Sequence, residues 1–131
     1  MPLTRIDVTD TIDHDRLTAL ADALHQAMVE SIGITPDNRH QLLTVHRPGE
    51  LIADPGFLNL ERGPEQVVVQ ITLRQGRSQQ AKRNLYARIA ELAAEKASVD
   101  PRNIFISLVE TESADWSFGS GQAQLLDAAS H

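Results

Sequence analysis

The sequence contains no cysteine among its 131 residues. Disulfide bonds, thiolate metal ligands and cysteine nucleophiles are therefore excluded. Aromatic residues are scarce at 4%, with a single tryptophan, and acidic residues outnumber basic ones to give a net charge of −6 and an isoelectric point near 5.2. This charge argues against a protein that binds nucleic acid or an anionic membrane, but it leaves room for a local positive pocket.

The sequence also lacks any apolar run of membrane-spanning length and any signal-peptide pattern, so we expect a cytoplasmic protein with no membrane partner. No phosphate-binding glycine loop and no Ser–His–Asp order is present. The histidines have no zinc-like spacing with carboxylates, and we therefore expect no metal site. They are His14, His25, His40, His46 and His131.

The length fits one domain with a sizeable core, and we predict a single domain over residues 1–131. Apolar residues recur with helical spacing over residues 13–32 and 78–97, where Gly33 would end the first helix and Ser78 would cap the second. Strands are predicted over residues 3–8, 41–47, 67–73 and 104–109. Residues 50–64 are predicted to form an ordered, irregular flap, and the chain is predicted to end in a short polar tail.

The order strand, helix, strand occurs twice, over about residues 2–47 and 66–109. Strands that flank one helix in the same sheet should be parallel, joined by right-handed crossovers. The predicted fold class is therefore α/β, a two-layer α+β arrangement in which tandem β-α-β units form a four-stranded sheet with both helices on one face. We expect Ile71 and its alternating neighbours to make the uncovered face apolar, which favours an oligomer. His25 lies off the apolar stripe of its helix and is expected in solvent.

Pro2 is the residue with the most distinctive chemistry. Removal of Met1 would leave a rigid secondary amine at the start of a strand, able to act as a general base, a general acid or a nucleophile. On the dipeptide alone, the alternative that Pro2 is only a common second residue stays open.

Four further segments, taken together with Pro2, resemble the tautomerase superfamily, and within it the malonate semialdehyde decarboxylase-like group. They are residues 27–29 in the first helix, 46–50 after the second strand, 76–78 at the start of the second helix, and Asp115 to Gly119 near the end. The resemblance implies a tautomerase-like fold, a homotrimer, and an amino-terminal proline at the floor of a pocket. It also implies a small keto, enol or oxo acid as substrate and no metal or organic cofactor.

In the decarboxylase group, the resemblance pairs the proline with a loop aspartate and with two arginines spaced Arg-x-Arg. The loop aspartate falls on Asn38 of this chain, the second arginine matches Arg77, and the first falls on Gln75, next to Arg74. We therefore assign Pro2, Arg77 and Asn38 to the catalytic positions.

Arg77 is interpreted as the clamp for the substrate carboxylate, because a guanidinium binds a carboxylate in bidentate geometry and a helix N-terminus attracts anions. Arg74 is a candidate helper, and Trp116 and Phe118 are candidate walls of the pocket. The alternatives are a solvated Arg77 and a Trp116 that packs in the core or at a subunit interface.

A neutral Pro2 amine would catalyse tautomerisation, whereas a protonated one would polarise the carbonyl of a 3-oxo acid and favour decarboxylation. Arginines lower the pKa of a nearby amine and carboxylates raise it, so Asn38 in place of aspartate favours the neutral amine. Tautomerase activity is thus the first hypothesis and malonate semialdehyde decarboxylase activity the second. A ferredoxin-like module that binds ligands or mediates assembly without chemistry has the same element order, and a family member that has lost its activity is a third alternative.

Overall fold

The computed structural model describes residues 2–129. Its strands are β1 (Leu3–Thr9), β2 (Gln41–His46), β3 (Val67–Arg74) and β4 (Ile104–Thr111), and its helices are α1 (His14–Ile32), α2 (Gln79–Ala97) and α3 (Gln124–Ala129). Short 3-10 turns follow at η1 (Phe57–Asn59), η2 (Pro101–Asn103) and η3 (Ser113–Asp115). The predicted strands and long helices are all present. The short helix α3 was missed, because its six residues are too few to show a periodic pattern.

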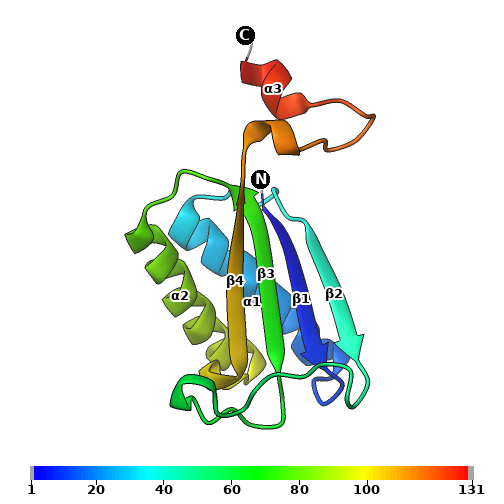
Figure 1. Ribbon diagram of the computed structural model, residues 1–131, viewed down its shortest axis with the longest axis vertical. Coiled ribbons are helices and arrows are strands. Elements are labelled where there is room, and N and C mark those ends of the chain that lie inside the picture. Colours follow the sequence, from blue (N-terminus) through cyan, green and yellow to red (C-terminus); the bar gives the residue numbers. More distant parts are fainter. Residues whose placement is uncertain (1, 130–131) are drawn as a thin grey trace.

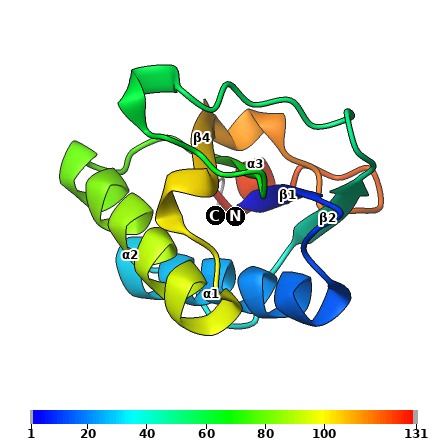
Figure 2. The ribbon, with the colours of Figure 1, turned by 90° about the horizontal axis from the view of Figure 1, so that it is seen from below.

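The sheet has the strand order β2-β1-β3-β4. β1 and β2 are parallel, β3 and β4 are parallel, and the two units meet through antiparallel pairing of β1 with β3. The helices α1 and α2 lie side by side behind this sheet and leave its other face open (Figures 1 and 2). The predicted doubled β-α-β fold with both helices on one face is therefore confirmed.

Local sequence signals set the ends of both long helices. The Asp13 side chain accepts a hydrogen bond from the backbone N–H of Arg16, and Gly33 ends α1 with a left-handed φ of 71°. Ser78 caps α2 by accepting from the backbone N–H of Ala81 at 3.1 Å. These caps explain why the helix bounds were predictable.

The core lies between the sheet and the two helices, and Ile71 belongs to it with no exposed surface. The prediction that Ile71 lies on the open face was wrong. β3 is apolar at both alternating sets of positions in its first half, so the sequence did not show which set faces the helices. Val68, Gln70 and Thr72 occupy the open face instead, which is mixed in polarity.

His25 is the second position at which the sequence interpretation was wrong. Its side chain is buried with 8% exposure, and its Nε2 lies 2.7 Å from the carbonyl oxygen of Pro36. The loop between α1 and β2 folds back over the helix at this point, and a non-local contact of this kind leaves no trace in helical periodicity. This hydrogen bond ties to α1 the loop that leads into β2.

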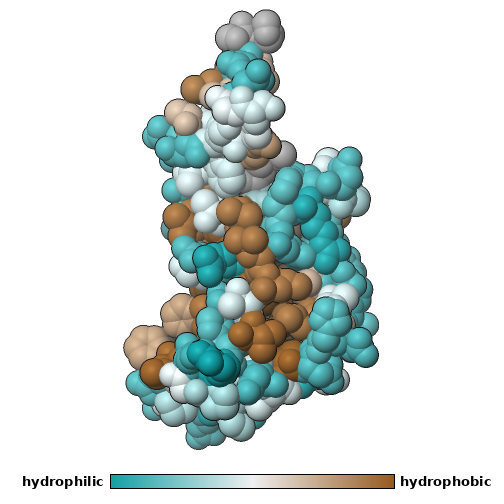
Figure 3. Space-filling view, turned by 90° about the vertical axis from the view of Figure 1, so that its right-hand side faces the viewer, coloured by the Kyte–Doolittle hydropathy of each residue, from teal (hydrophilic) through white to brown (hydrophobic). Residues whose placement is uncertain are grey.

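The flap between β2 and β3 runs across the lower end of the molecule in Figure 1. Arg62 anchors it by donating hydrogen bonds to the carbonyl oxygens of Arg102 and Asp54, and its guanidinium lies 5.6 Å from the centre of the Phe105 ring. Apolar side chains also gather on the side of the molecule that carries the edge strand β2 (Figure 3). The exposed apolar residues of that strand are Leu42, Leu43 and Val45.

Over residues 2–129, none of the helices combines the length and the apolar character that crossing a membrane requires.

Candidate active site

Four strand ends meet at one edge of the sheet. The antiparallel register pairs Leu3 with Thr72, so the start of β1 lies beside the last residues of β3. The parallel registers bring the start of β2 and the end of β4 to the same edge. The start of β1 lies at this edge, below the segment that follows β4 (Figure 1).

A pocket of about 450 Å³ opens at this edge. Among the residues that line it, Pro2 is the one that is buried. We call it the Pro2 pocket. Its lining residues come from the starts of β1 and β2, the ends of β3 and β4, and the segment after β4; they are Pro2, Leu3, His40, Thr72, Thr111, Asp115, Trp116, Ser117 and Phe118. The fold therefore brings the first residues of the chain against residues more than a hundred positions later.

Trp116 and Phe118 form an aromatic wall of the Pro2 pocket. Their rings are stacked, with centroids 5.7 Å apart and planes inclined by 27°. The indole Nε1 of Trp116 donates a 2.7 Å hydrogen bond to Thr111 Oγ1. The side chain of Gln124 in α3 fixes the backbone at Phe118 and Gly119. Its Oε1 accepts a hydrogen bond from the backbone N–H of Phe118, and its Nε2 donates one to the Gly119 carbonyl.

His40 and Asp115 are the side chains near this wall that can carry charge, and the sequence interpretation assigned a role to neither. The His40 carbonyl accepts a 3.0 Å hydrogen bond from the backbone N–H of Thr4, which fixes its position beside β1. Asp115 Oδ2 accepts from the backbone N–H of Glu112 at 2.8 Å. The signals in the sequence for these two residues were weak. His40 lies between a predicted loop and the predicted second strand, and Asp115 is the first residue of one of the segments that carry the family resemblance.

A second pocket of about 670 Å³ adjoins the first, and Thr111 lines both. We call it the arginine pocket. Its lining residues are Arg74, Gln75, Gly76, Arg77, Thr111, Glu112, Ser113, Ala114 and Leu126. Gly76 makes the turn between β3 and α2 with a φ of 123°, a conformation that residues with a Cβ rarely adopt.

The two arginines of this pocket lie close together. Arg77 Nη1 donates a 3.0 Å hydrogen bond to the carbonyl oxygen of Arg74. Burial lowers the pKa of the Arg77 guanidinium, and the positive charge of Arg74 lowers it further. A bound anion would relieve this repulsion, so the arrangement suits a carboxylate.

Asn38 lies in the loop between α1 and β2, two residues before His40, and its backbone N–H donates to the Thr35 carbonyl at 3.0 Å. It is not one of the residues that line the Pro2 pocket or the arginine pocket. Of the predicted site residues, Pro2, Trp116 and Phe118 thus share one pocket, and Arg74 and Arg77 share the other.

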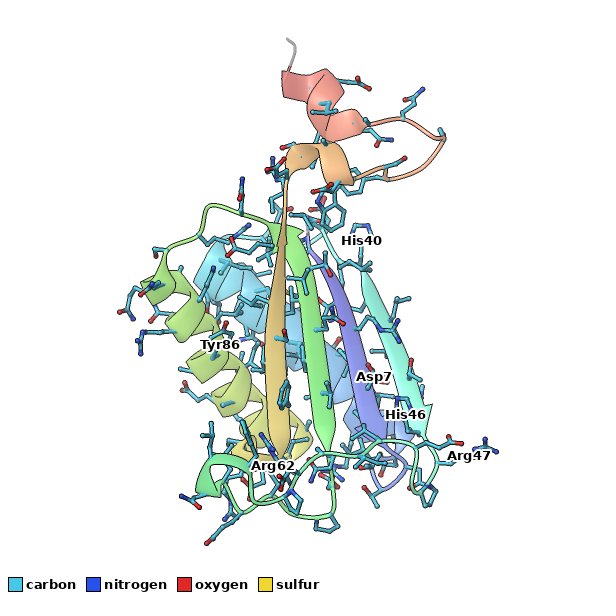
Figure 4. All side chains as sticks on the ribbon, in the orientation of Figure 1. Asp7, His40, His46, Arg47, Arg62 and Tyr86 are labelled. Carbon is cyan, nitrogen blue, oxygen red and sulfur yellow. The ribbon has the colours of Figure 1, made fainter. Side chains whose placement is uncertain are left out.

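The opposite end of the sheet carries a different set of polar residues (Figure 4). His46 Nε2 lies 2.7 Å from Asp7 Oδ1, and Arg47 forms an ion pair with Glu50. Within the part of the chain that the structure describes, no cluster of three or more histidine, aspartate or glutamate residues could hold a metal ion.

Comparison with known proteins gives a consistent family. Two family models, both describing a tautomerase enzyme, match residues 38–119 and residues 2–56. The probable tautomerase YusQ of Bacillus subtilis is 32% identical over 97% of this chain and 100% of its own length. The probable tautomerase YrdN of the same organism is 31% identical over 96% of this chain and 97% of its own length.

Solved structures extend the comparison. A malonate semialdehyde decarboxylase inhibited by 3-bromopropiolate superposes with a TM-score of 0.91 at 35% identity, over 97% of this chain and 96% of that one. A second malonate semialdehyde decarboxylase, described as having decarboxylase and hydratase activities, gives 0.89 at 30% identity, over 97% and 98% of the two chains. A fused 4-OT described as a symmetric trimer shares the fold, with a TM-score of 0.77 at 21% identity over 95% and 98%.

Proposed function

The chain belongs to the tautomerase family, and we propose that it is a cofactor-free enzyme in which the Pro2 amine moves protons on a small keto or enol acid. The observation that carries the proposal is the position of Pro2, buried in a pocket that adjoins a pair of arginines. The proposal requires removal of Met1, because only a terminal proline has a free amine.

Substrate binding follows from the two adjoining pockets. The carboxylate of the substrate would lie in the arginine pocket, held by Arg77 and Arg74. Its reacting carbons would then extend past Thr111 into the Pro2 pocket, against the aromatic wall of Trp116 and Phe118. Fixing both ends of a small acid in this way orients the reacting carbon toward the amine.

The proton transfer uses Pro2 as the base. The neutral amine takes a proton from the carbon next to the carbonyl, and the electrons of the broken C–H bond form a C=C bond. The carbonyl oxygen takes up a proton and becomes the enol hydroxyl. In the reverse direction the protonated amine returns a proton to carbon while the hydroxyl loses its own, so atoms and charge balance.

The protonation state of Pro2 depends on the charges around it. Arg74 and Arg77 lower the pKa of a nearby amine, and Asn38 adds no carboxylate to oppose them. Asp115 acts in the opposite direction, but it is one carboxylate against two guanidinium groups. This balance supports the neutral amine and hence tautomerisation.

Decarboxylation of a 3-oxo acid such as malonate semialdehyde is the second candidate function, and the high similarity to two malonate semialdehyde decarboxylases favours it. In this reaction the protonated Pro2 would hydrogen-bond to the 3-oxo group. The electrons of the breaking C–C bond flow toward that oxygen, CO2 leaves, and the resulting enol takes a proton on carbon.

We further propose a homotrimer. The support is the open face of the sheet, the exposed apolar residues Leu42, Leu43 and Val45, and a symmetric trimer of the same fold. Light scattering after size exclusion should give three times the chain mass of 14.4 kDa, and a monomeric mass at micromolar concentration would overturn this part of the proposal.

Covalent labelling tests the role of Pro2. Intact mass spectrometry would first establish that Met1 is absent. Treatment with 3-bromopropiolate, which inhibits the similar decarboxylase, should then add one modification that maps to Pro2. The adduct should be lost in Arg77→Ala and retained in Arg47→Ala, whose arginine is exposed at the other end of the sheet. Absence of selective labelling in the unmodified sequence would support the non-catalytic alternative.

Kinetics separate the two reactions. We expect enolisation of aryl pyruvates, the direction that begins with the neutral amine, to be faster than CO2 release from 3-oxopropanoate. The opposite order of kcat/KM would make decarboxylation the main function.

A further inference from the structure

We propose that His40 is a second acid–base residue of this site, which exchanges a proton with the substrate oxygen while Pro2 exchanges one with carbon. The inference rests on the proposed function. It identifies the group that supplies a proton to the substrate's carbonyl oxygen. It concerns a position to which the sequence interpretation gave no role.

Backbone pairing places His40 next to the reactive terminus. The register of β1 with β2 begins at Thr4 and Gln41, and the hydrogen bond from Thr4 N to the His40 carbonyl extends it by one residue. His40 therefore stands beside Leu3, adjacent in sequence to Pro2, and Figure 4 shows it at the same end of the sheet as the N-terminus.

The side chains on either side of His40 fix the direction in which it points. Arg39 Nη2 donates to Asp22 of α1 at 2.8 Å, and Gln41 Nε2 donates to the Ala21 carbonyl of the same helix at 2.8 Å. Because successive side chains of an extended segment point to opposite faces, His40 points away from α1. That direction leads to the open face, where it lines the Pro2 pocket.

The imidazole of His40 is available for chemistry. His25 and His46 each commit a ring nitrogen, to the Pro36 carbonyl and to Asp7 respectively. His40 is exposed, and its ring has no hydrogen bond or ion pair with any residue between 2 and 129. An imidazole without a protein partner can donate a proton from one ring nitrogen and accept one at the other, as a general acid–base must.

The charged groups around this imidazole are few. Asp115 lines the same pocket and precedes Trp116 of the aromatic wall. Asp37 and Arg39 precede His40 in the same loop, and Arg39 donates a hydrogen bond to Asp22. Arg5, which is opposite Leu42 on β1, lies 4.0 Å from the carboxylate of Asp7. None of these carboxylates is paired with the imidazole, which leaves the ring free to meet a substrate oxygen.

The two residues divide the proton transfers between carbon and oxygen. As Pro2 removes the proton from carbon, the protonated imidazole of His40 gives one to the developing enolate oxygen. The products are the enol, a protonated amine and a neutral imidazole. In the reverse direction the neutral imidazole accepts the hydroxyl proton and the amine returns a proton to carbon, after which solvent exchange restores the starting states.

The test compares His40→Ala, His40→Gln and the matched control His46→Gln in the enolisation of an aryl pyruvate. A general acid–base residue typically contributes about 100-fold or more to rate, so kcat should fall at least that far in both His40 variants. KM should change little, and added imidazole should restore a saturable part of kcat to His40→Ala. His46→Gln should keep the original kcat. The backbone bond to Thr4 is unaffected by these changes, and circular dichroism checks the fold.

A His40→Gln variant with kcat within about threefold of the original, or a His40→Ala variant that imidazole leaves unchanged, would overturn the acid–base role. Failure of the proposed function has a different signature. In that case the unmodified sequence itself shows neither enolisation nor 3-bromopropiolate labelling at Pro2. If Pro2 is still labelled in His40→Ala while kcat is lost, then Pro2 remains reactive without His40, and the two residues have distinct roles.

Discussion

The hydroxyl of Thr111 accepts a 2.7 Å hydrogen bond from the indole N–H of Trp116 and donates one of 2.8 Å to the Leu73 carbonyl. One side chain thus connects the aromatic wall to the end of β3. Thr111 also lines both pockets, so it lies where the arginine pocket adjoins the Pro2 pocket.

Thr111→Val keeps the shape of this side chain but removes both hydrogen bonds. We expect a loss of about 1–3 kcal/mol in the free energy of unfolding, since a partly buried indole N–H loses its partner. Trp116 is the only tryptophan, so its fluorescence should shift to the red and report on the pocket directly. Thr18→Val, which removes an exposed hydroxyl bonded within α1, should leave the spectrum unchanged. An unchanged spectrum in both variants would contradict the role of Thr111.

Arg77→Met should separate binding from stability. Hydrogen bonds to charged groups contribute about 1.5–3 kcal/mol, so KM for the acid substrate should rise about 10- to 100-fold. The folded state lowers the pKa of Arg77 and thus disfavours its charged form, so the free energy of unfolding should be unchanged or higher. Steady-state kinetics and urea unfolding measure the two effects. A less stable Arg77→Met with normal KM would indicate a structural role instead.

Asn38→Asp restores a carboxylate to the loop before β2. A negative charge favours the protonated amine, so the pH midpoint for 3-bromopropiolate labelling of Pro2 should move upward. The labelling rate measured across a pH series gives this midpoint. Asn84→Asp on the exposed surface of α2 is a matched control that should leave it in place. A midpoint that stays constant or falls in Asn38→Asp would contradict the electrostatic argument for a neutral Pro2.

Arg16 connects three parts of the chain. Its guanidinium forms a bidentate pair with Glu65 at 2.6 and 2.8 Å and donates to the carbonyl oxygens of Ala97 and Ser98. Arg16→Met should lower the free energy of unfolding by about 1.5–3 kcal/mol. Arg102→Met also breaks an arginine–carboxylate pair, but one between exposed neighbours, and should cost much less in the same urea titration. Equal losses in the two variants would show that the connection across elements contributes nothing.

Acid should weaken the fold through paired carboxylates. A hydrogen bond from Arg88 lowers the pKa of Glu30, and one from Lys82 lowers the pKa of Glu110. A lowered folded-state pKa means that the unfolded chain binds more protons, so this stabilisation is complete above the unfolded pKa of about 4 and is lost below it. Urea unfolding between pH 3 and 7 should show a smaller decline for Glu30→Gln than for the exposed control Glu95→Gln. Parallel declines would exclude a contribution from the Glu30 pair.

The sequence by itself determined the order and type of the main elements. Capping residues such as Asp13 and Ser78 act within a few positions of themselves, and apolar periodicity reports directly on which helix face is buried. The doubled strand–helix–strand order then left few topologies compatible with short right-handed crossovers. Pro2, Arg74, Arg77, Trp116 and Phe118 could be named as candidates on the same local basis, together with their resemblance to a family.

Only the tertiary structure decided which of these residues lie together. The pairing of β3 with β1 decides which alternating set of β3 side chains faces the helices. Both sets contain apolar residues, so the burial of Ile71 could not be inferred from the strand alone. The burial of His25 depends on a loop that folds back over α1. Likewise, His40 and Pro2 line the same pocket only because β1 and β2 run parallel from the same end of the sheet. Contacts between distant segments arise from strand register and packing. A residue's neighbours in the sequence determine neither of them.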